Sequence, residues 1–144
     1  MRRLTTPLVI AAALFVAAGG YVHLREWLDG YRNVPVEAPG AAVVRVGFVV
    51  NAAASFAIAA ALVVTQFAGR RLAPLVMVGA ALSQVAFAVA VVVSRTASLG
   101  GWREPVWTRG ASQSLAVEIG ALVALAAVAS VALLERRRLA PALA

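Results

Sequence analysis

The sequence contains no cysteine, no lysine and little charge of either sign. The absence of Cys excludes disulfides, thiolate metal ligands and thiol chemistry. Only 13% of the 144 residues are charged, compared with about 25% in soluble domains. The net charge of +7 comes from Arg alone, and the Arg residues stand at the ends of apolar runs. Because a nucleic-acid binder needs a basic face on a folded surface, we expect no nucleic-acid partner.

Apolar residues are in excess. They make up 62% of the chain, and the mean hydropathy is +0.90. One small soluble domain cannot bury so much, so lipid must solvate part of it. Four runs are long enough to span a bilayer as helices, and they are too uniformly apolar for barrel strands. The sequence predicts one all-α domain over 1–144, a transmembrane antiparallel four-helix bundle with spans at about 7–28, 43–68, 72–93 and 112–134.

The first span has an alternative interpretation as a secretory signal peptide. Met1, Arg2 and Arg3 precede an apolar run, and small residues follow at 17–19. Cleavage there would leave three helices. The apolar run continues to Leu28, beyond the usual 7–15 residues of a signal peptide, so a retained span is favoured.

Arginine clusters indicate the orientation of the bundle. They lie at 2–3, 70–71 and 136–138, and four spans place all three on one side. By the positive-inside rule we expect a plasma-membrane protein with both termini in the cytoplasm. The aromatic residues Trp27, Trp102 and Trp107 fall near the outer interface, where they would anchor the protein to the headgroups. The loop from Trp102 to Trp107 is also a candidate partner surface, although anchoring is favoured.

Small and polar residues inside the spans predict how the helices join. Gly79 and Gly120 each have a second small residue four positions later, and we expect both at helix contacts. Asn51 and Gln84 fall near the midplane of neighbouring antiparallel helices. We expect their amides to bond to each other as an interhelical clamp, which is favoured over a role in lining a polar pathway.

Ionisable residues inside the spans predict a polar cluster near the outer ends of the helices. Glu118 lies about two turns inside the fourth span, His23 at a similar depth in the first, and Arg45 slightly higher in the second. Such residues are costly in lipid and usually find a partner within the bundle. We expect His23, Arg45 and Glu118 to meet, with Glu26 and Tyr31 around the mouth of the cluster. It is either a clamp that fixes helix register, which is favoured, or a proton-accepting or ligand-binding pocket open to the outside.

The sequence offers little support for a known catalytic or cofactor-binding motif. With one His and no HxxxH or ExxH spacing, we expect no metal site. A bis-His haem is excluded, whereas a haem with one His ligand stays open. Ser112 and Ser114 lie near Glu118, but no Gly-x-Ser-x-Gly elbow or phosphate-binding Gly loop occurs. We therefore expect no cofactor and favour a protein that is not an enzyme.

The segment from His23 to Pro35 reads His-Leu-x-x-Trp-Leu-x-Gly-Tyr-Arg-x-Val-Pro, and Phe48-Val49-Val50-Asn51-Ala52 follows it. This pattern resembles small four-span integral membrane proteins of high-GC Gram-positive bacteria, a group that is essentially uncharacterised. The resemblance covers mainly the first half of the chain. It implies the same four-span fold. The layout is also similar to that of DoxX-like membrane proteins, although no DoxX motif is present.

Three functions remain after these exclusions. The favoured one is an accessory or scaffold subunit that binds a membrane partner or a second copy of itself. The alternative is a small transporter or redox-linked membrane protein with an outward-facing pocket around His23 and Glu118. A membrane enzyme acting on a lipid or quinone is the third. A cavity that reaches His23 and Glu118 would favour the second and third, and a fully packed bundle would count against them.

Overall fold

The computed structural model describes residues 2–67 and 71–139. They form α1 (Arg2–Asp29), a short 3-10 helix η1 (Tyr31–Asn33), α2 (Ala41–Val64), α3 (Ala73–Thr96) and α4 (Arg109–Leu139). Within these two ranges the only β-pairing is an isolated bridge between Leu99 and Trp102. All four α-helices are long and apolar enough to cross a membrane. The predicted all-α, four-span fold is confirmed, and the chain has the architecture of a multi-pass membrane protein.

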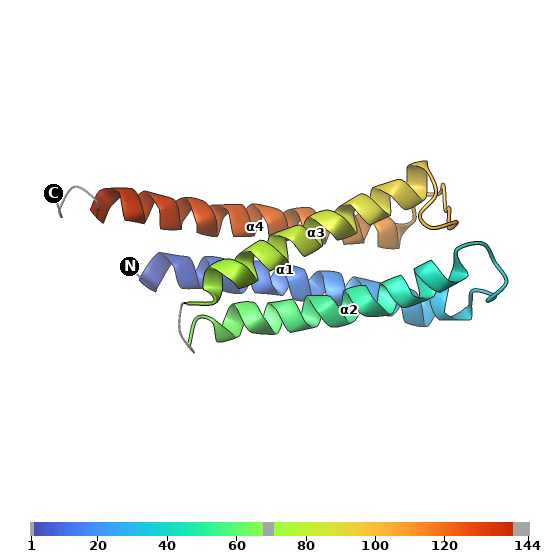
Figure 1. The fold of residues 1–144 in the computed structure, drawn as a ribbon, viewed down its shortest axis with the longest axis horizontal. Coiled ribbons are helices and arrows are strands. Elements are labelled where there is room, and N and C mark those ends of the chain that lie inside the picture. The colour runs from blue at the N-terminus through green and yellow to red at the C-terminus, as the bar shows by residue number, and fades with distance from the viewer. Residues whose placement is uncertain (1, 68–70, 140–144) are drawn as a thin grey trace.

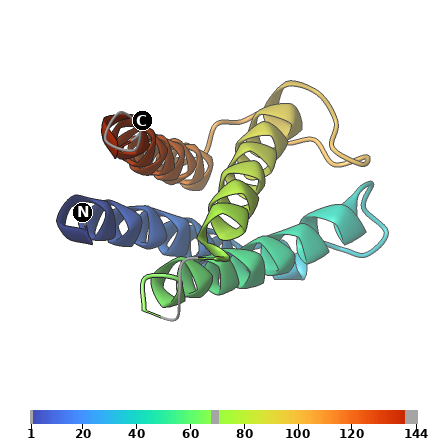
Figure 2. The ribbon, with the colours of Figure 1, turned by 60° about the vertical axis from the view of Figure 1, so that its left-hand side comes forward.

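The four helices run antiparallel to their neighbours along the chain (Figure 1). The start of α1, the end of α2, the start of α3 and the end of α4 lie at one end, here called the terminal end. The loops at 30–40 and 97–108 lie at the other, the loop end. Helix α1 packs against both α2 and α4, whereas α3 packs against α4 and less extensively against α2. In Figures 1 and 2, α3 lies near α2 at the terminal end and diverges from it toward the loop end.

The observed helix boundaries differ from the predicted spans by a few residues. Helix α1 begins at Arg2 rather than at residue 7. Helix α2 ends at Val64 rather than at 68, and beyond it the Thr65 hydroxyl donates to the Leu62 carbonyl at 2.8 Å. Helix α4 begins at Arg109 rather than at 112, because the Thr108 hydroxyl accepts a hydrogen bond from the Ala111 N–H at 3.1 Å. Arg70, part of one predicted arginine cluster, lies outside the described residues.

The buried apolar core occupies the terminal half of the bundle. Its members are all Ala, Val or Leu: Val9, Ala12, Ala13, Val16, Ala59, Leu62, Ala80, Ala121, Leu125 and Val128. Gly120 makes the close contact expected of it, since a Cβ there would lie 2.7 Å from ring atoms of Phe15. The same expectation for Gly79 is wrong, because a Cβ at Gly79 would meet nothing within 4 Å. Gly120 therefore lets α4 approach α1 closely, whereas Gly79 makes no such contact for α3.

The two long loops contact each other at the loop end. Gly40 ends the first loop with φ of +73°, a left-handed conformation that favours glycine. A Cβ at Gly40 would lie 2.2 Å from the backbone nitrogen of Trp102 in the second loop. This backbone contact leaves no room for a side chain, and it sets the position of Trp102 above the interior of the bundle.

Candidate functional site

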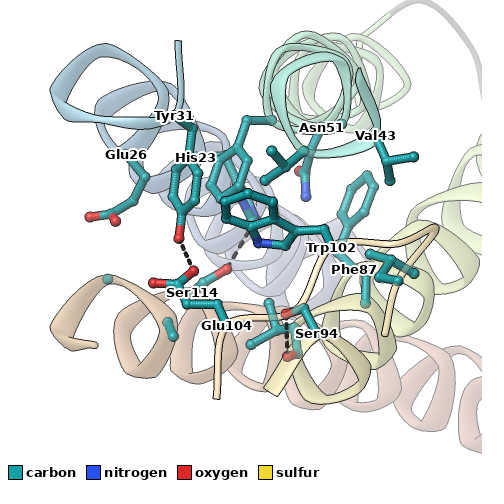
Figure 3. Close-up of a pocket in the computed structure, with 18 of the residues that line it drawn as sticks. His23, Glu26, Tyr31, Val43, Asn51, Phe87, Ser94, Trp102, Glu104 and Ser114 are labelled. Atoms are coloured by element: carbon teal, nitrogen blue, oxygen red, sulfur yellow. Dashed lines mark hydrogen bonds between the residues drawn. The ribbon is translucent and has the colours of Figure 1, made fainter. Parts of the chain in front are cut away.

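A pocket of about 250 Å³ lies between the helices at the loop end. Residues of α1, η1, α2, α3, α4 and the second long loop line it (Figure 3). Most of the wall is apolar, from Val22, Val43, Phe48, Phe87 and Leu99 among others. A few polar side chains, including His23, converge on it. A concave apolar site with few converging polar groups is typical of small-molecule sites, although this one is slightly below their usual volume of about 300–1,000 Å³.

His23 and Glu118 contact each other at the inner side of this pocket. The His23 Nε2 atom lies 3.0 Å from Oε1 of Glu118, and both residues are buried. The expected proximity of the two residues is thus observed. Ser114, one turn before Glu118, donates from Oγ to the same carboxylate oxygen at 3.0 Å and also lies 3.0 Å from His23 Nε2. His23 and Ser114 line the pocket, whereas Glu118 lies behind them and reaches it through these contacts.

The arrangement of these three side chains excludes a serine-hydrolase triad. In a triad the nucleophile and the acid bind opposite nitrogens of the imidazole. Here Ser114 and Glu118 share Nε2, while Nδ1 has no hydrogen bond to any residue that the structure describes. The second carboxylate oxygen of Glu118, Oε2, is buried without a partner. The cluster can hold a proton between an imidazole and a carboxylate, but it is not built to activate the Ser114 hydroxyl.

A second polar group lies in the wall of the pocket, where α3, η1 and the second loop meet. Arg95, at the end of α3, donates from Nη1 to Oε2 of Glu104 at 2.7 Å and to the Glu104 carbonyl at 3.2 Å. The Tyr31 hydroxyl donates to the same Glu104 carboxylate (Figure 3). Burial, reinforced by the hydrogen bond to Glu104, raises the pKa of Tyr31 to about 12. Tyr31 therefore stays protonated and ties η1 to the second loop and α3.

Glu26 lines the pocket at the first turn of α4. A Cβ built on Gly110 would lie 2.2–2.5 Å from the three carboxyl atoms of Glu26, so the carboxylate packs directly on that turn. The Glu26 carboxylate makes no hydrogen bond or ion pair with the described residues, although the positive end of the α4 dipole favours a negative charge there. The predicted mouth residues Glu26 and Tyr31 both lie in the pocket wall.

The structure does not bring Arg45 to this cluster, and that part of the prediction is wrong. Arg45 makes no ion pair, and it lines a separate hollow on α2 together with Trp27 and Val36. The neighbouring residue Val44 is the buried one, so the Arg45 side chain leaves α2 in another direction. The cation at the pocket is Arg95 instead.

The predicted bond between Asn51 and Gln84 is not formed. The Asn51 carbonyl oxygen accepts a hydrogen bond from Ser55 Oγ, 3.1 Å away on the same helix, and Asn51 lines the pocket. Gln84 is only 1% exposed, and neither polar atom of its amide has a partner. The two residues therefore do not clamp α2 to α3, which agrees with the limited contact between those helices.

The three tryptophans predicted as interface anchors occupy different surroundings. Trp102 lines the pocket, with its ring edge toward Tyr31 and 6.1 Å between ring centroids. Trp27 lies in the hollow beside Arg45, and Trp107 is 49% exposed in the second loop. All three are at the loop end, and anchoring remains a prediction for each.

Sequence reasoning missed most of the pocket wall. It gave no role here to Phe48, Phe87 or Glu104, and it considered Ser114 only as a nucleophile. The spacing of Ser114 and Glu118, four residues apart on one helix face, was the available signal for Ser114. In residues 2–67 and 71–139, no three His, Asp or Glu side chains come close enough to hold a metal ion. No protein-family description, curated protein or solved structure matches the chain.

Proposed function

We propose that this membrane protein binds a small, largely apolar molecule in the pocket at the loop end. The observation that supports this proposal is the cavity of about 250 Å³, lined by side chains from all four helices and reaching His23. A bundle built only as a scaffold needs no such space. Binding is the step that a small transporter and a redox-linked membrane protein have in common.

The buried His23–Glu118 pair gives the pocket a site for a proton. An ionisable pair inside a membrane-spanning bundle is costly and often marks a substrate or proton pathway. His23 lines the pocket, and Glu118 contacts its imidazole from behind at Nε2, so a ligand would lie beside a group that can accept or donate a proton. Ligand binding and protonation of this pair would then be coupled.

The mouth of the pocket lies on the side where α2 and α3 diverge. Val43 and Val50 of α2 line the pocket and are also 42% and 56% exposed. With the arginine clusters in the cytoplasm, as the positive-inside rule favours, this mouth faces the outer leaflet of the plasma membrane. We propose that the ligand enters there from the lipid or from the outer surface.

Native mass spectrometry of protein gently extracted from its own membrane tests the proposal. We expect a bound small molecule of defined mass in the wild type and its loss in Gly47→Leu. Gly47 lines the pocket, and a Cβ there meets nothing within 4 Å, so the larger side chain begins in open space and should take up room that a ligand needs. Gly79→Leu is the matched control, because Gly79 also faces open space but does not line the pocket. A wild type that carries only scattered lipid, like Gly47→Leu, would contradict the proposal.

An accessory-subunit role is the second candidate. Val106 and Trp107 in the second loop are 65% and 49% exposed, and aromatic residues are enriched where proteins bind each other. The same mass spectrum separates the two functions, because a defined protein complex without a small molecule would favour this role. Loss of that complex in Trp107→Ala would show that the surface around Trp107 binds the partner. Membership in the four-span group of high-GC Gram-positive bacteria is likewise a proposal, carried by the His23–Pro35 pattern.

A further inference from the structure

We infer that the ligand is a monovalent organic cation with an apolar body, bound between the Glu26 carboxylate and the aromatic wall of the pocket. This inference rests on the proposed binding function and adds the chemical class of the ligand. Two independent features of the pocket point to it, the balance of charge and the gathering of aromatic rings, and the pocket also offers acceptors to a protonated amine.

The charges at the pocket leave a negative excess. Arg95 and Glu104 neutralise each other through a contact of 2.7 Å. Glu26 has no cationic partner. The His23–Glu118 pair adds a further negative charge when Glu118 is ionised and His23 is neutral. It adds no net charge when the pair holds one more proton. The pocket is therefore negative in either state, within a chain whose net charge is +7. An anionic ligand would meet repulsion, and a cation would complete the charge balance.

The polar groups at the pocket include acceptors that a cation can use. Glu26 offers both carboxylate oxygens. When Glu118 is ionised, His23 directs its Nε2 proton to Ser114 and Glu118, and Nδ1 is left as an acceptor. Asn51 adds an amide, with its oxygen already bonded to Ser55. Arg95 Nε has no partner, but it is fully buried and does not face the cavity. A protonated amine, which is a donor only, would bond to the Glu26 and His23 acceptors and not to the Asn51 amide nitrogen, which is itself a donor.

Aromatic rings gather at this one pocket. The chain has three Trp, two Tyr and five Phe residues, and Tyr31, Phe48, Phe87 and Trp102 line the cavity. Figure 3 shows Trp102 between Tyr31 and Phe87, over the interior of the pocket. Tyr31 stacks on Phe48 at 4.2 Å between centroids, which stiffens the wall. Such rings attract a cation through their negative faces, Trp most strongly, and by about 2 kcal/mol when the cation is desolvated.

Binding of a matched pair of probes tests this inference. Benzyltrimethylammonium and its neutral isostere neopentylbenzene have the same shape and differ in charge. Trp27 and Trp107 do not line the pocket, so the Trp27→Phe, Trp107→Phe background leaves Trp102 as the reporter of binding by fluorescence. In nanodiscs we expect the cation to bind at least tenfold more tightly than the isostere. Glu26→Gln should remove about tenfold from the affinity for the cation and leave the isostere unchanged.

The controls separate failure of this inference from failure of the proposed function. Glu37→Gln is the matched variant, because Glu37 is an exposed loop carboxylate outside the pocket, and it should bind the cation as the reporter background does. If the isostere binds as tightly as the cation, and Gly47→Leu abolishes that binding, the ligand is not a cation although the pocket binds small molecules. If neither probe binds and no endogenous molecule is retained, both the inference and the proposed function are wrong.

Discussion

The two halves of the bundle are built from different side chains. In the terminal half, the core consists of Ala, Val and Leu, and helices approach closely over small residues. In the loop half, the buried residues include His23, Arg95 and Glu118, and aromatic rings surround a cavity. Close packing at the terminal end therefore holds the helices together, while the loop end retains a cavity and buried charged side chains.

This difference explains why α3 is the least embedded helix. At the terminal end Ala80 is fully buried in the core, so α3 is fixed there. Toward the loop end Phe87 and Arg95 reach into the pocket, and α3 is held through Glu104 and the loops instead of by close helix contact. The bundle thus separates the residues that give stability from those available for binding. Four predictions can break or sharpen that comparison.

The largest effect is expected from Glu118→Ala in the loop half. The change leaves His23 and Ser114 buried without their carboxylate partner, and we expect it to lower the free energy of unfolding by about 3 kcal/mol. Glu118→Gln keeps an acceptor oxygen and should lower the free energy of unfolding by less. Equilibrium unfolding in mixed micelles measures both.

A double-mutant cycle provides the control for this prediction. Glu118 and His23 should couple by about 1 kcal/mol or more, because they share a buried hydrogen bond. Glu118 and Arg45 should not couple, because Arg45 lies in a separate hollow. Absence of coupling between Glu118 and His23 would mean that the cluster does not contribute to stability as a unit.

The second prediction compares the introduction of a Leu side chain in each of the two halves. Ala12 is fully buried in the terminal core, so Ala12→Leu should overpack it and cost about 2 kcal/mol. Gly47→Leu places a Leu in the pocket, where it meets open space, and should leave stability unchanged or raise it by up to about 1 kcal/mol through the better helix propensity. The same unfolding assay applies, and equal losses in both variants would show that the two halves are packed alike.

The fold could be predicted from the sequence because lipid imposes a simple requirement. A chain crossing a bilayer must satisfy every backbone polar group internally, so long apolar runs become helices of predictable length. The proximity of His23 and Glu118 was predictable for a related reason, since ionisable residues at one depth have few partners other than each other. Both conclusions depend only on how far along its helix a residue lies, and the residue's position in the sequence gives that distance directly.

The partners of other residues depend on how each helix is rotated about its axis. In a soluble helix the apolar face shows that rotation, but in a membrane both faces are apolar and the signal is lost. The sequence could not show that Val44 points inward and Arg45 does not, or that Gln84 and Asn51 fail to meet. The pairing of Arg95 with Glu104 was hidden for another reason, because loop conformation has no periodic pattern.

A smaller effect on stability is expected from loss of the Tyr31–Glu104 contact in the pocket wall. Tyr31→Phe removes the hydrogen bond to Glu104 and should lower the free energy of unfolding at neutral pH by about 1 kcal/mol. Because folding raises the pKa of Tyr31 from 10 to about 12, the folded state holds this proton more tightly. The wild type should therefore lose stability as the pH rises from 10 through 12, and Tyr31→Phe should lack that loss. The tyrosinate absorbance of the wild type should include a phase near pH 12 that is missing in the variant, and an unchanged titration curve would contradict the buried contact.

The smallest change in stability is expected where Glu26 packs on α4. In Gly110→Ala the new Cβ would overlap the Glu26 carboxylate, which is the end of a flexible side chain and can swing away. We expect unfolding to change by less than about 0.5 kcal/mol, because the gain in helix propensity offsets the displacement. Binding should respond more than stability does, since the carboxylate leaves the pocket wall and the affinity for benzyltrimethylammonium should fall about as far as in Glu26→Gln. Combining the two substitutions should then produce no further loss of affinity, because each acts through the same carboxylate. An additive loss in the double variant would show that Gly110 affects binding through the position of α4 and not through Glu26.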